Sequence, residues 1–290
     1  TIAILWQLLL ALLAVPAWAA PNHIAAELVA SNPSAPGTGI TLALHFRPEP
    51  GWHGYWRNPG DAGLGMKLTW NVPQGATVGP PRYPVPQTLL IAGLMNHVYE
   101  HDYAVLQSFT IPAGARQDAE LPVSVKAEWL ACNPQLCVPE SAELRTVVKV
   151  HHMMPGEGPP PFNPKYSEDW ERRLSAPLES PARFAIEGNR IRIAIPLPGS
   201  VPLHDPHLFI GEDKVVEYAA VQTFSREKDL LIVEMPRAKF GAIAPTALSG
   251  VLRLAREGDD GLSFAAAPGT VPPSGKPIDS SAQRDRLSLP

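Results

Sequence analysis

The sequence predicts an all-β protein with two β-sandwich domains in series, after an N-terminal signal peptide. Thirty-four prolines and 22 glycines in 290 residues suit short strands joined by turns, because proline breaks the interior of a helix. Short segments of alternating apolar and polar residues recur between clusters of turn residues, which is typical of β-sandwiches. About 270 residues follow the signal peptide, a length that suggests two domains.

The predicted signal peptide is residues 1–20. This stretch contains no charge and closes on Ala17-Trp18-Ala19-Ala20, the pattern of an apolar region followed by a cleavage site. A membrane anchor is the alternative, since a spanning helix needs about 20 apolar residues. The interruptions at Gln7 and Pro16 and the small residues at the end favour cleavage, after Ala19 or Ala20. We therefore expect an exported protein.

The first sandwich is expected over residues 21–152. Proline- and glycine-rich turns, such as Pro48-Glu49-Pro50-Gly51 and Asn58-Pro59-Gly60-Asp61, separate its alternating segments. Such segments are half-buried strands, with one face towards the core and the other towards solvent. The expected strands are 23–30, 40–46, 67–72, 104–111, 121–130 and 143–150.

A linker, a second sandwich and a tail are expected after the first domain. Residues 153–165 are rich in proline and glycine and read as a semi-extended linker. The second sandwich is expected over 166–267, opening with a short helix at 167–174 that Ser167 would cap. Residues 268–290 are rich in Pro, Ser and Gly and are expected to be disordered. We also expect this chain to be a piece of a longer protein.

Charge and motifs exclude several classes of function. The formal net charge of −4 offers no attraction to nucleic acid. The sequence contains no Gly-x-Ser-x-Gly, no Walker-type glycine loop and no H-E-x-x-H. Acidic residues such as Asp61, Glu100 and Asp102 are scattered, without a spacing that specifies acid–base partners. Nothing in these patterns calls for a bound cofactor.

The two cysteines, Cys132 and Cys137, are the first feature to explain, because disulfides persist in exported proteins. A strand enters, an Asn133-Pro134 turn reverses it and a second strand leaves, so a hairpin would bring the cysteines within disulfide range. Closing so short a loop adds little stability, whereas exposed or strained disulfides are the labile ones. A structural disulfide, a redox-active pair and a metal site all remain open on the spacing alone.

Two groups of residues could supply metal ligands. Met95, His97 and His101 lie close together in the sequence, as do the residues of 151–154, and such side chains accept copper. Neither group has the fixed spacing of a metal motif. Solvated surface histidines are therefore the favoured interpretation, and no metal site is assigned. A copper-binding protein of copper tolerance is the alternative function that these residues suggest.

Three segments, in order, carry a family resemblance. They are EPGWHGYWRNPGDAG at 49–63, NHVYE at 96–100, and WLACNPQLCVPE at 129–140. Together they resemble the N-terminal periplasmic domain of the DsbD/ScsB family of thiol:disulfide interchange proteins, over residues 23–150. The part from Tyr166 onward resembles the second sandwich of the ScsB-like branch less distinctively.

The resemblance implies an immunoglobulin-like domain with a redox-active pair, Cys132 and Cys137. It implies a protein-disulfide reductase component of the periplasm, without a bound cofactor. It also implies that a membrane segment follows this chain in a longer protein, and a stand-alone periplasmic protein is the alternative. Its partners would be a membrane-embedded thiol–disulfide transporter domain, which donates electrons, and periplasmic thioredoxin-like oxidoreductases, which accept them. Exchange proceeds through a mixed disulfide, and Cys137 is expected to attack first. The second sandwich is expected to orient the first or to dock a partner.

The resemblance also implies a cap over the disulfide. The better-known branch of the family uses an acidic pair and an aromatic ring there, and the matching place in this sequence differs. The possible cap or tuning residues are Asn96, His97, Val98, Tyr99 and Glu100. Trp52, Tyr55 and Trp56 are expected mainly to pack in the core and in turns.

Overall fold

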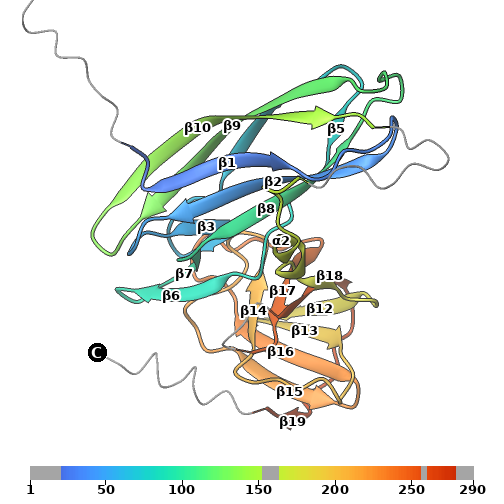
Figure 1. The fold of residues 1–290 in the computed structure, drawn as a ribbon. Helices are drawn as coiled ribbons and strands as arrows, with labels where there is room; N and C mark the ends of the chain where they lie inside the picture. The colour runs from blue at the N-terminus through green and yellow to red at the C-terminus, as the bar shows by residue number, and fades with distance from the viewer. Residues whose placement is uncertain (1–20, 152–162, 256–259, 279–290) are drawn as a thin grey trace, which may run out of the picture.

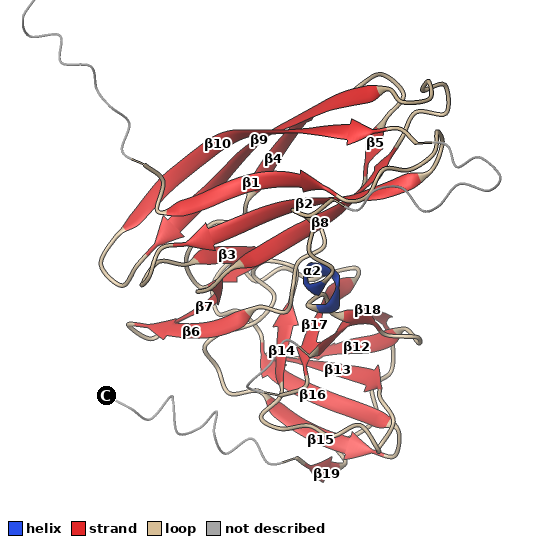
Figure 2. Cartoon of the chain, viewed as in Figure 1, coloured by secondary structure: helices blue, strands red, loops and turns tan. Residues whose placement is uncertain are grey.

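The computed structural model of the protein describes residues 21–151, 163–255 and 260–278. Their regular secondary structure is almost entirely strand, as Figure 2 shows, which confirms the predicted all-β class. No helix among them is long and apolar enough to cross a membrane. The predicted signal peptide and most of the predicted linker lie outside the described residues.

Two sheets form the sandwich of the first domain. Their inward side chains alternate with outward ones along each strand, so Leu42 and Leu44 of one sheet meet Val125 and Ala127 of the other in a single apolar core. The first sheet contains, in order, β1 (Ile24–Ala30), β2 (Gly39–Pro48), β8 (Tyr103–Thr110) and β5 (Thr77–Val78). The second contains β10 (Cys137–Lys149), β9 (Glu120–Cys132) and β4 (Lys67–Asn71).

A third, smaller sheet flanks this sandwich. It consists of β3 (Gly54–Gly60), β7 (Leu94–Tyr99) and β6 (Gln87–Ile91), and Figure 1 shows it below β2 and β8. Ala92 and Gly93 join β6 to β7 with φ values of 50° and 80°. Two positive φ values are what a two-residue hairpin turn of type I′ requires.

The second domain is a single nine-stranded sheet that curls around its own core. Its path runs through β14 (His207–Ile210), β17 (Leu248–Arg253), β18 (Gly261–Pro268), β12 (Ala182–Glu187), β13 (Arg190–Pro196), β16 (Leu230–Pro236), β15 (Thr223–Glu227) and β19 (Lys276–Pro277), and β11 (Ala176–Pro177) pairs with β18. Leu208 from β14 and Phe224 from β15 come from distant parts of this path. Both belong to the same apolar cluster, so the sheet encloses it.

The predicted helix is only one turn long. It is α2 (Asp169–Arg172), and its N-cap is Glu168, without a side-chain cap, rather than the expected Ser167. The Ser167 hydroxyl accepts a hydrogen bond from the Asp169 N–H at 3.3 Å, one residue earlier in the turn. Tyr166 and Trp170 lie on the outer face of β1, β2 and β8, where they cover Val29. We expected residue 166 to open the second domain. Instead, these aromatic rings cover apolar side chains of the first domain that would otherwise meet solvent.

The two domains share a packed interface. Phe209, from the second domain, is fully buried and belongs to the apolar core of the first, as does Val251. The Asn58 amide donates to the Ile210 carbonyl at 2.8 Å and to the Tyr218 hydroxyl at 3.0 Å. Buried apolar rings and satisfied polar groups of this kind resemble a protein interior.

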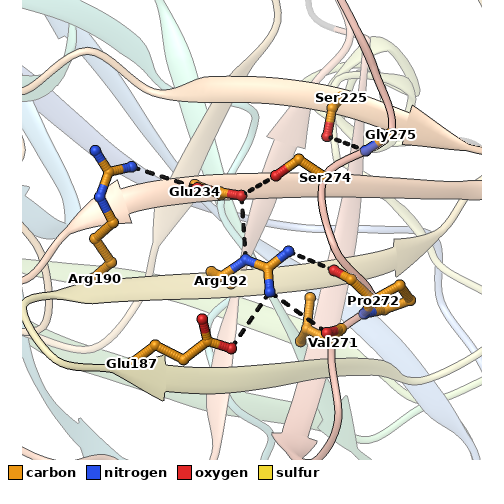
Figure 3. Close-up of polar contacts among 9 residues, drawn as sticks. All are labelled: Glu187, Arg190, Arg192, Ser225, Glu234, Val271, Pro272, Ser274 and Gly275. Carbon is orange, nitrogen blue, oxygen red and sulfur yellow. Dashed lines mark hydrogen bonds and ion pairs between the residues drawn. The ribbon is translucent and has the colours of Figure 1, made fainter.

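Residues 268–278 differ from the disordered tail that the composition suggests. They form a strap across β13, β16 and β15, drawn in Figure 3. Val271 is buried against Ala194 and Ile232, and the Arg192 guanidinium donates to the carbonyls of Val271 and Pro272. The sheet surface supplies these partners, so local composition does not reveal them. Residues 279–290 lie outside the described residues.

We expect Ser274→Ala to loosen the strap in a pH-dependent way. Hydrogen bonds from Ser274 and Arg192 lower the pKa of Glu234 below its ordinary 4.5. Because the folded-state pKa is the lower one, this stabilisation is present above pH 4.5 and is lost as the pH falls through the folded pKa. Losing one hydrogen bond to a carboxylate should cost about 1 kcal/mol at pH 7. Thermal unfolding at pH 7 and pH 3 tests this, with the exposed Ser200→Ala as control; an equal effect at both pH values would contradict it.

Candidate redox site

Cys132 and Cys137 form a disulfide at the turn end of the β9–β10 hairpin. The two residues pair directly in the register, with their Cα atoms 4.1 Å apart. The backbone of Cys132 does not bond to Cys137, because its N–H and carbonyl bond to His53 instead. A close, non-hydrogen-bonded pair of this kind brings two side chains together across antiparallel strands. The predicted hairpin is confirmed.

The four residues between the cysteines form a closed turn. The Asn133 side-chain oxygen accepts hydrogen bonds from the N–H groups of Gln135 and Leu136, at 2.9 and 2.8 Å. The Asn133 N–H donates to the Leu136 carbonyl at 2.9 Å, and proline after an asparagine suits such a turn. Leu136 is 54% exposed. The sequence therefore fixes a short loop that presents an apolar side chain beside Cys137.

The two cysteines differ sharply in exposure. Cys132 is 1% exposed, whereas Cys137 belongs to the exposed residues of the loop. Thiol–disulfide exchange requires an attacking thiolate to reach one particular sulfur atom. In this arrangement the reachable sulfur is that of Cys137.

The disulfide lies on the outer face of the β9–β10 sheet, away from the sandwich core. Trp129 and Ala131 point into that core, so Leu130 and Cys132 point the other way. There Cys132 packs in a small cluster with Tyr55 of β3 and Val98 of β7, and Leu89 of β6 packs against it. The third sheet therefore covers the buried half of the disulfide.

Comparison with known proteins decides the family of this domain. Residues 22–149 match the family model described as the N-terminal domain of thiol:disulfide interchange protein DsbD. The first domain is a DsbD N-terminal domain. It is therefore a thiol:disulfide interchange module, and its cysteine pair is the group that such exchange requires.

A solved structure extends the likeness of fold beyond the first domain. The N-terminal periplasmic domain of ScsB from Proteus mirabilis superposes with a TM-score of 0.60 at 16% identity, covering 89% of this chain and 97% of that one. Both domains of this chain therefore share the fold of that ScsB domain. The GAE domain of yeast GGA1 (TM-score 0.26, 12% identity, 44% and 94% covered) and the major pilin BcpA of Bacillus cereus (0.28, 8%, 86% and 69%) are too distant to inform the site. No curated protein matches the sequence.

The residues predicted to cap the DsbD-type disulfide do not act together. Val98 contacts the cluster around Cys132. The Asn96 amide donates to the carbonyls of Leu89 and Leu94, at 3.3 and 3.0 Å, and so holds the β6–β7 hairpin together. Of the five predicted residues, Val98 is therefore the one that packs with the cysteine.

His97, Tyr99 and Glu100 lie elsewhere. The His97 ring points to the second domain, with its centroid 5.0 Å from that of Phe209. Tyr99 belongs to the sandwich core and donates to the Pro84 carbonyl at 2.7 Å, while Glu100 is exposed. The reason is that residues 94–99 form a strand, so neighbouring side chains face opposite ways.

The suggested copper ligands are not assembled in the described part of the chain. His97 is fully enclosed, and burial lowers the pKa of its imidazole to about 4. Its Nδ1 atom lies 2.9 Å from the Asn58 carbonyl, while His101 is on the surface. No group of three or more His, Cys, Asp or Glu side chains in the described residues is placed to hold a metal ion. Residues 152–154 lie outside that part.

Two residues beside the disulfide, His53 and Tyr55, were not predicted from the sequence as site residues. His53 pairs with Cys132 through two backbone hydrogen bonds, of 2.8 and 3.1 Å, and its Nε2 atom lies 3.3 Å from the Tyr55 hydroxyl. Burial lowers the pKa of His53 and raises that of Tyr55. His53 directly precedes β3 and Tyr55 belongs to it, and a spacing of two in extended chain signals that their side chains share a face. The pairing of His53 with Cys132, 79 positions apart, leaves no local signal.

Glu140 is a buried carboxylate near the disulfide with a structural role. It accepts hydrogen bonds from the Ile24 N–H at 3.1 Å and from the Trp129 indole at 2.9 Å. It therefore fixes the beginning of β1 against β10 on the core side of the sheet, opposite to the face that carries the cysteines.

Proposed function

We propose that this chain is a periplasmic protein-disulfide reductase module that relays two electrons through Cys132 and Cys137. The donor is a membrane-embedded thiol–disulfide transporter domain, and the acceptors are periplasmic thioredoxin-like oxidoreductases. One observation carries the proposal: a DsbD-type domain holds a disulfide between an exposed residue, Cys137, and a buried one, Cys132.

The exposure of the cysteines supports a particular order of steps. A donor thiolate attacks the Cys137 sulfur, the intramolecular S–S bond breaks, and its electron pair passes to the Cys132 sulfur. A mixed disulfide then joins the donor to Cys137. The second donor thiolate attacks the donor sulfur of that bond, which releases Cys137 as a thiolate and leaves the donor oxidised.

Delivery of the electrons reverses the order. The Cys137 thiolate attacks the disulfide of the acceptor and forms a mixed disulfide, and the acceptor's other sulfur leaves as a thiolate. The Cys132 thiolate then attacks the Cys137 sulfur, which restores the intramolecular disulfide and releases the reduced acceptor. Each step moves one electron pair between sulfur atoms, so no bound cofactor is required.

The β6–β7 hairpin serves as the cover of the buried sulfur in this proposal. Val98 and Leu89 are apolar and pack with the cluster around Cys132, so they keep small thiols from that sulfur. His97, the neighbour of Val98, packs on the opposite face against Phe209. The second domain would thus support the cover from behind, which is the role we assign to it.

The reduction potential of the Cys132–Cys137 couple is the test. We expect a value between about −180 and −270 mV, the range of exchanging carriers. The purified chain would be equilibrated with glutathione buffers, and free thiols would be trapped and counted by mass spectrometry. A value below about −300 mV is typical of a structural disulfide and would exclude electron relay. Titration with copper(I) of the chain and of its Cys132→Ser, Cys137→Ser variant checks the copper alternative.

A further inference from the structure

His53, the residue before β3, lies directly opposite Cys132 in an isolated antiparallel bridge. The His53 N–H donates to the Cys132 carbonyl at 2.8 Å, and the Cys132 N–H donates to the His53 carbonyl at 3.1 Å. This exchange of both hydrogen bonds defines a hydrogen-bonded antiparallel pair, whose Cα atoms lie about 5.5 Å apart. The two side chains of such a pair project from the same face of the sheet and interact.

The neighbours of His53 confirm which face this is. A Cβ atom on Gly54 would lie 2.4 Å from the Tyr103 hydroxyl oxygen, and Trp56 belongs to the sandwich core, so these two residues face inward. His53 and Tyr55 therefore face outward, and their rings contact each other with centroids 5.3 Å apart. Tyr55 in turn packs with Cys132. The imidazole, the phenol and the buried sulfur thus share one face.

Exchange at Cys137 releases Cys132 as a thiolate in this buried place. A buried charge without a hydrogen-bond donor is costly, and the apolar neighbours Val98, Leu89 and Leu130 supply none. The Tyr55 hydroxyl of the same cluster lies 3.3 Å from His53 Nε2, so it is engaged with the imidazole. His53 is 2% exposed, and burial lowers its pKa, so its ring is neutral at pH 7. A neutral imidazole carries one N–H donor and one acceptor nitrogen.

Other ionisable groups on the packed elements are placed differently. The Glu140 carboxylate lies on the core side, Glu128 is four residues along β9 and accepts from Lys126 at 2.9 Å, and Glu100 of the loop after β7 is exposed. On the face in question the described ionisable side chains next to Cys132 are therefore His53, Tyr55 and Cys137.

We propose that His53 is the hydrogen-bond and proton partner of Cys132 during disulfide exchange. This inference rests on the proposed function, and it adds a residue to it. When the S–S bond breaks, the imidazole N–H donates to the Cys132 thiolate. In the dithiol state the ring accepts the thiol proton as Cys132 becomes the attacking thiolate. The Tyr55 hydroxyl, 3.3 Å from Nε2, orients the ring.

Two variants test the role, with the exposed His101→Gln as matched control. The rate constant for reduction of the disulfide by dithiothreitol would be measured from pH 5 to pH 9. His53→Phe keeps a buried ring without hydrogen-bonding atoms and should slow reduction by about tenfold or more, the worth of a hydrogen bond to a charged group. His53→Gln keeps a donor, and should recover much of the rate but lose the pH dependence that His53 contributes. Equal profiles for all four proteins would overturn the proposal.

A measurement on the unaltered chain removes dependence on how well the variants fold. The imidazole signals of His53 would be titrated by NMR in the oxidised and in the reduced protein. Coupling between two sites is reciprocal, so in the reduced protein the His53 signals should show a further transition at the pH where Cys132 ionises, which the oxidised protein lacks. Identical titrations in both states would overturn the proposal. The proposed function is tested independently of His53. It would be contradicted if the reduction potential of the wild-type Cys132–Cys137 couple lay outside the range of exchanging carriers.

Discussion

Replacing Cys132 with serine is expected to convert the chain into a trap for its exchange partners. The exposed Cys137 thiolate would still attack a partner disulfide, but no second thiolate would remain to resolve the mixed disulfide. Turnover should fall to background, and a covalent adduct should accumulate. Incubation with an oxidised thioredoxin-like protein, followed by non-reducing electrophoresis and mass spectrometry, would identify Cys137 as the linked residue.

Cys137→Ser is the matched control for this trap. Its remaining thiol, on Cys132, is 1% exposed, so alkylation and adduct formation should be at least about tenfold slower, because reactivity depends on access. Comparable adducts in both variants would contradict the assignment of Cys137 as the accessible sulfur. That result would also mean that the third sheet does not protect Cys132 in solution.

Phe209→Ala is expected to be the most destabilising single substitution at the interface between the domains. Phe209 is fully buried, and its ring contacts His97 and Trp56, with centroids 5.0 and 5.9 Å away. Truncating a buried phenylalanine costs about 3–5 kcal/mol of the free energy of unfolding. Since Phe209 supports the strand that carries Val98, reduction by small thiols should also become faster. Chemical denaturation and reduction kinetics measure the two effects.

Phe240→Ala provides a matched control, because Phe240 is 88% exposed. Substitution of an exposed side chain usually changes stability by no more than about 0.5 kcal/mol. Equal stability losses for the two variants would contradict the packed interface. A large loss for Phe209→Ala with unchanged reduction kinetics would preserve the interface but remove its proposed support of the cover.

The local parts of the site were predictable from the sequence. Alternation and turn residues indicate the β9–β10 hairpin, and the position of Asn133 and Pro134 places its reversal between the cysteines. The family segments indicate the DsbD-type domain that the comparison confirms. These features depend on residues that are neighbours in the chain, so their pattern is visible before folding.

The cap was only partly predictable, because its segment is a strand rather than a loop. In a strand, consecutive side chains point to opposite faces, so His97 and Val98 cannot both cover the disulfide. Alternation alone would have divided the five residues of 96–100 into two groups. It would not have shown which group faces Cys132, since that depends on the pairing of β3 with β7 and of His53 with Cys132.

The strap shows the limit of composition as a guide. Proline, serine and glycine dominate residues 268–278, and such segments rarely bury enough apolar surface to order themselves. Here Val271 fits against β13 and β16, and Lys276 pairs with Arg226 of β15. The partners lie at least 35 residues earlier, so order in this segment is a property of the surface it crosses.

The long hairpin that carries the disulfide implies a carrier with little reorganisation between its redox states. Twelve further pairs extend the register from Val138↔Ala131 to Lys149↔Glu120, and these do not depend on the S–S bond. A loop of only four residues also gives the bond little influence on the unfolded chain. Reduction should therefore leave the fold intact, and the direction of electron flow follows from the local chemistry of two thiols and from the partners present.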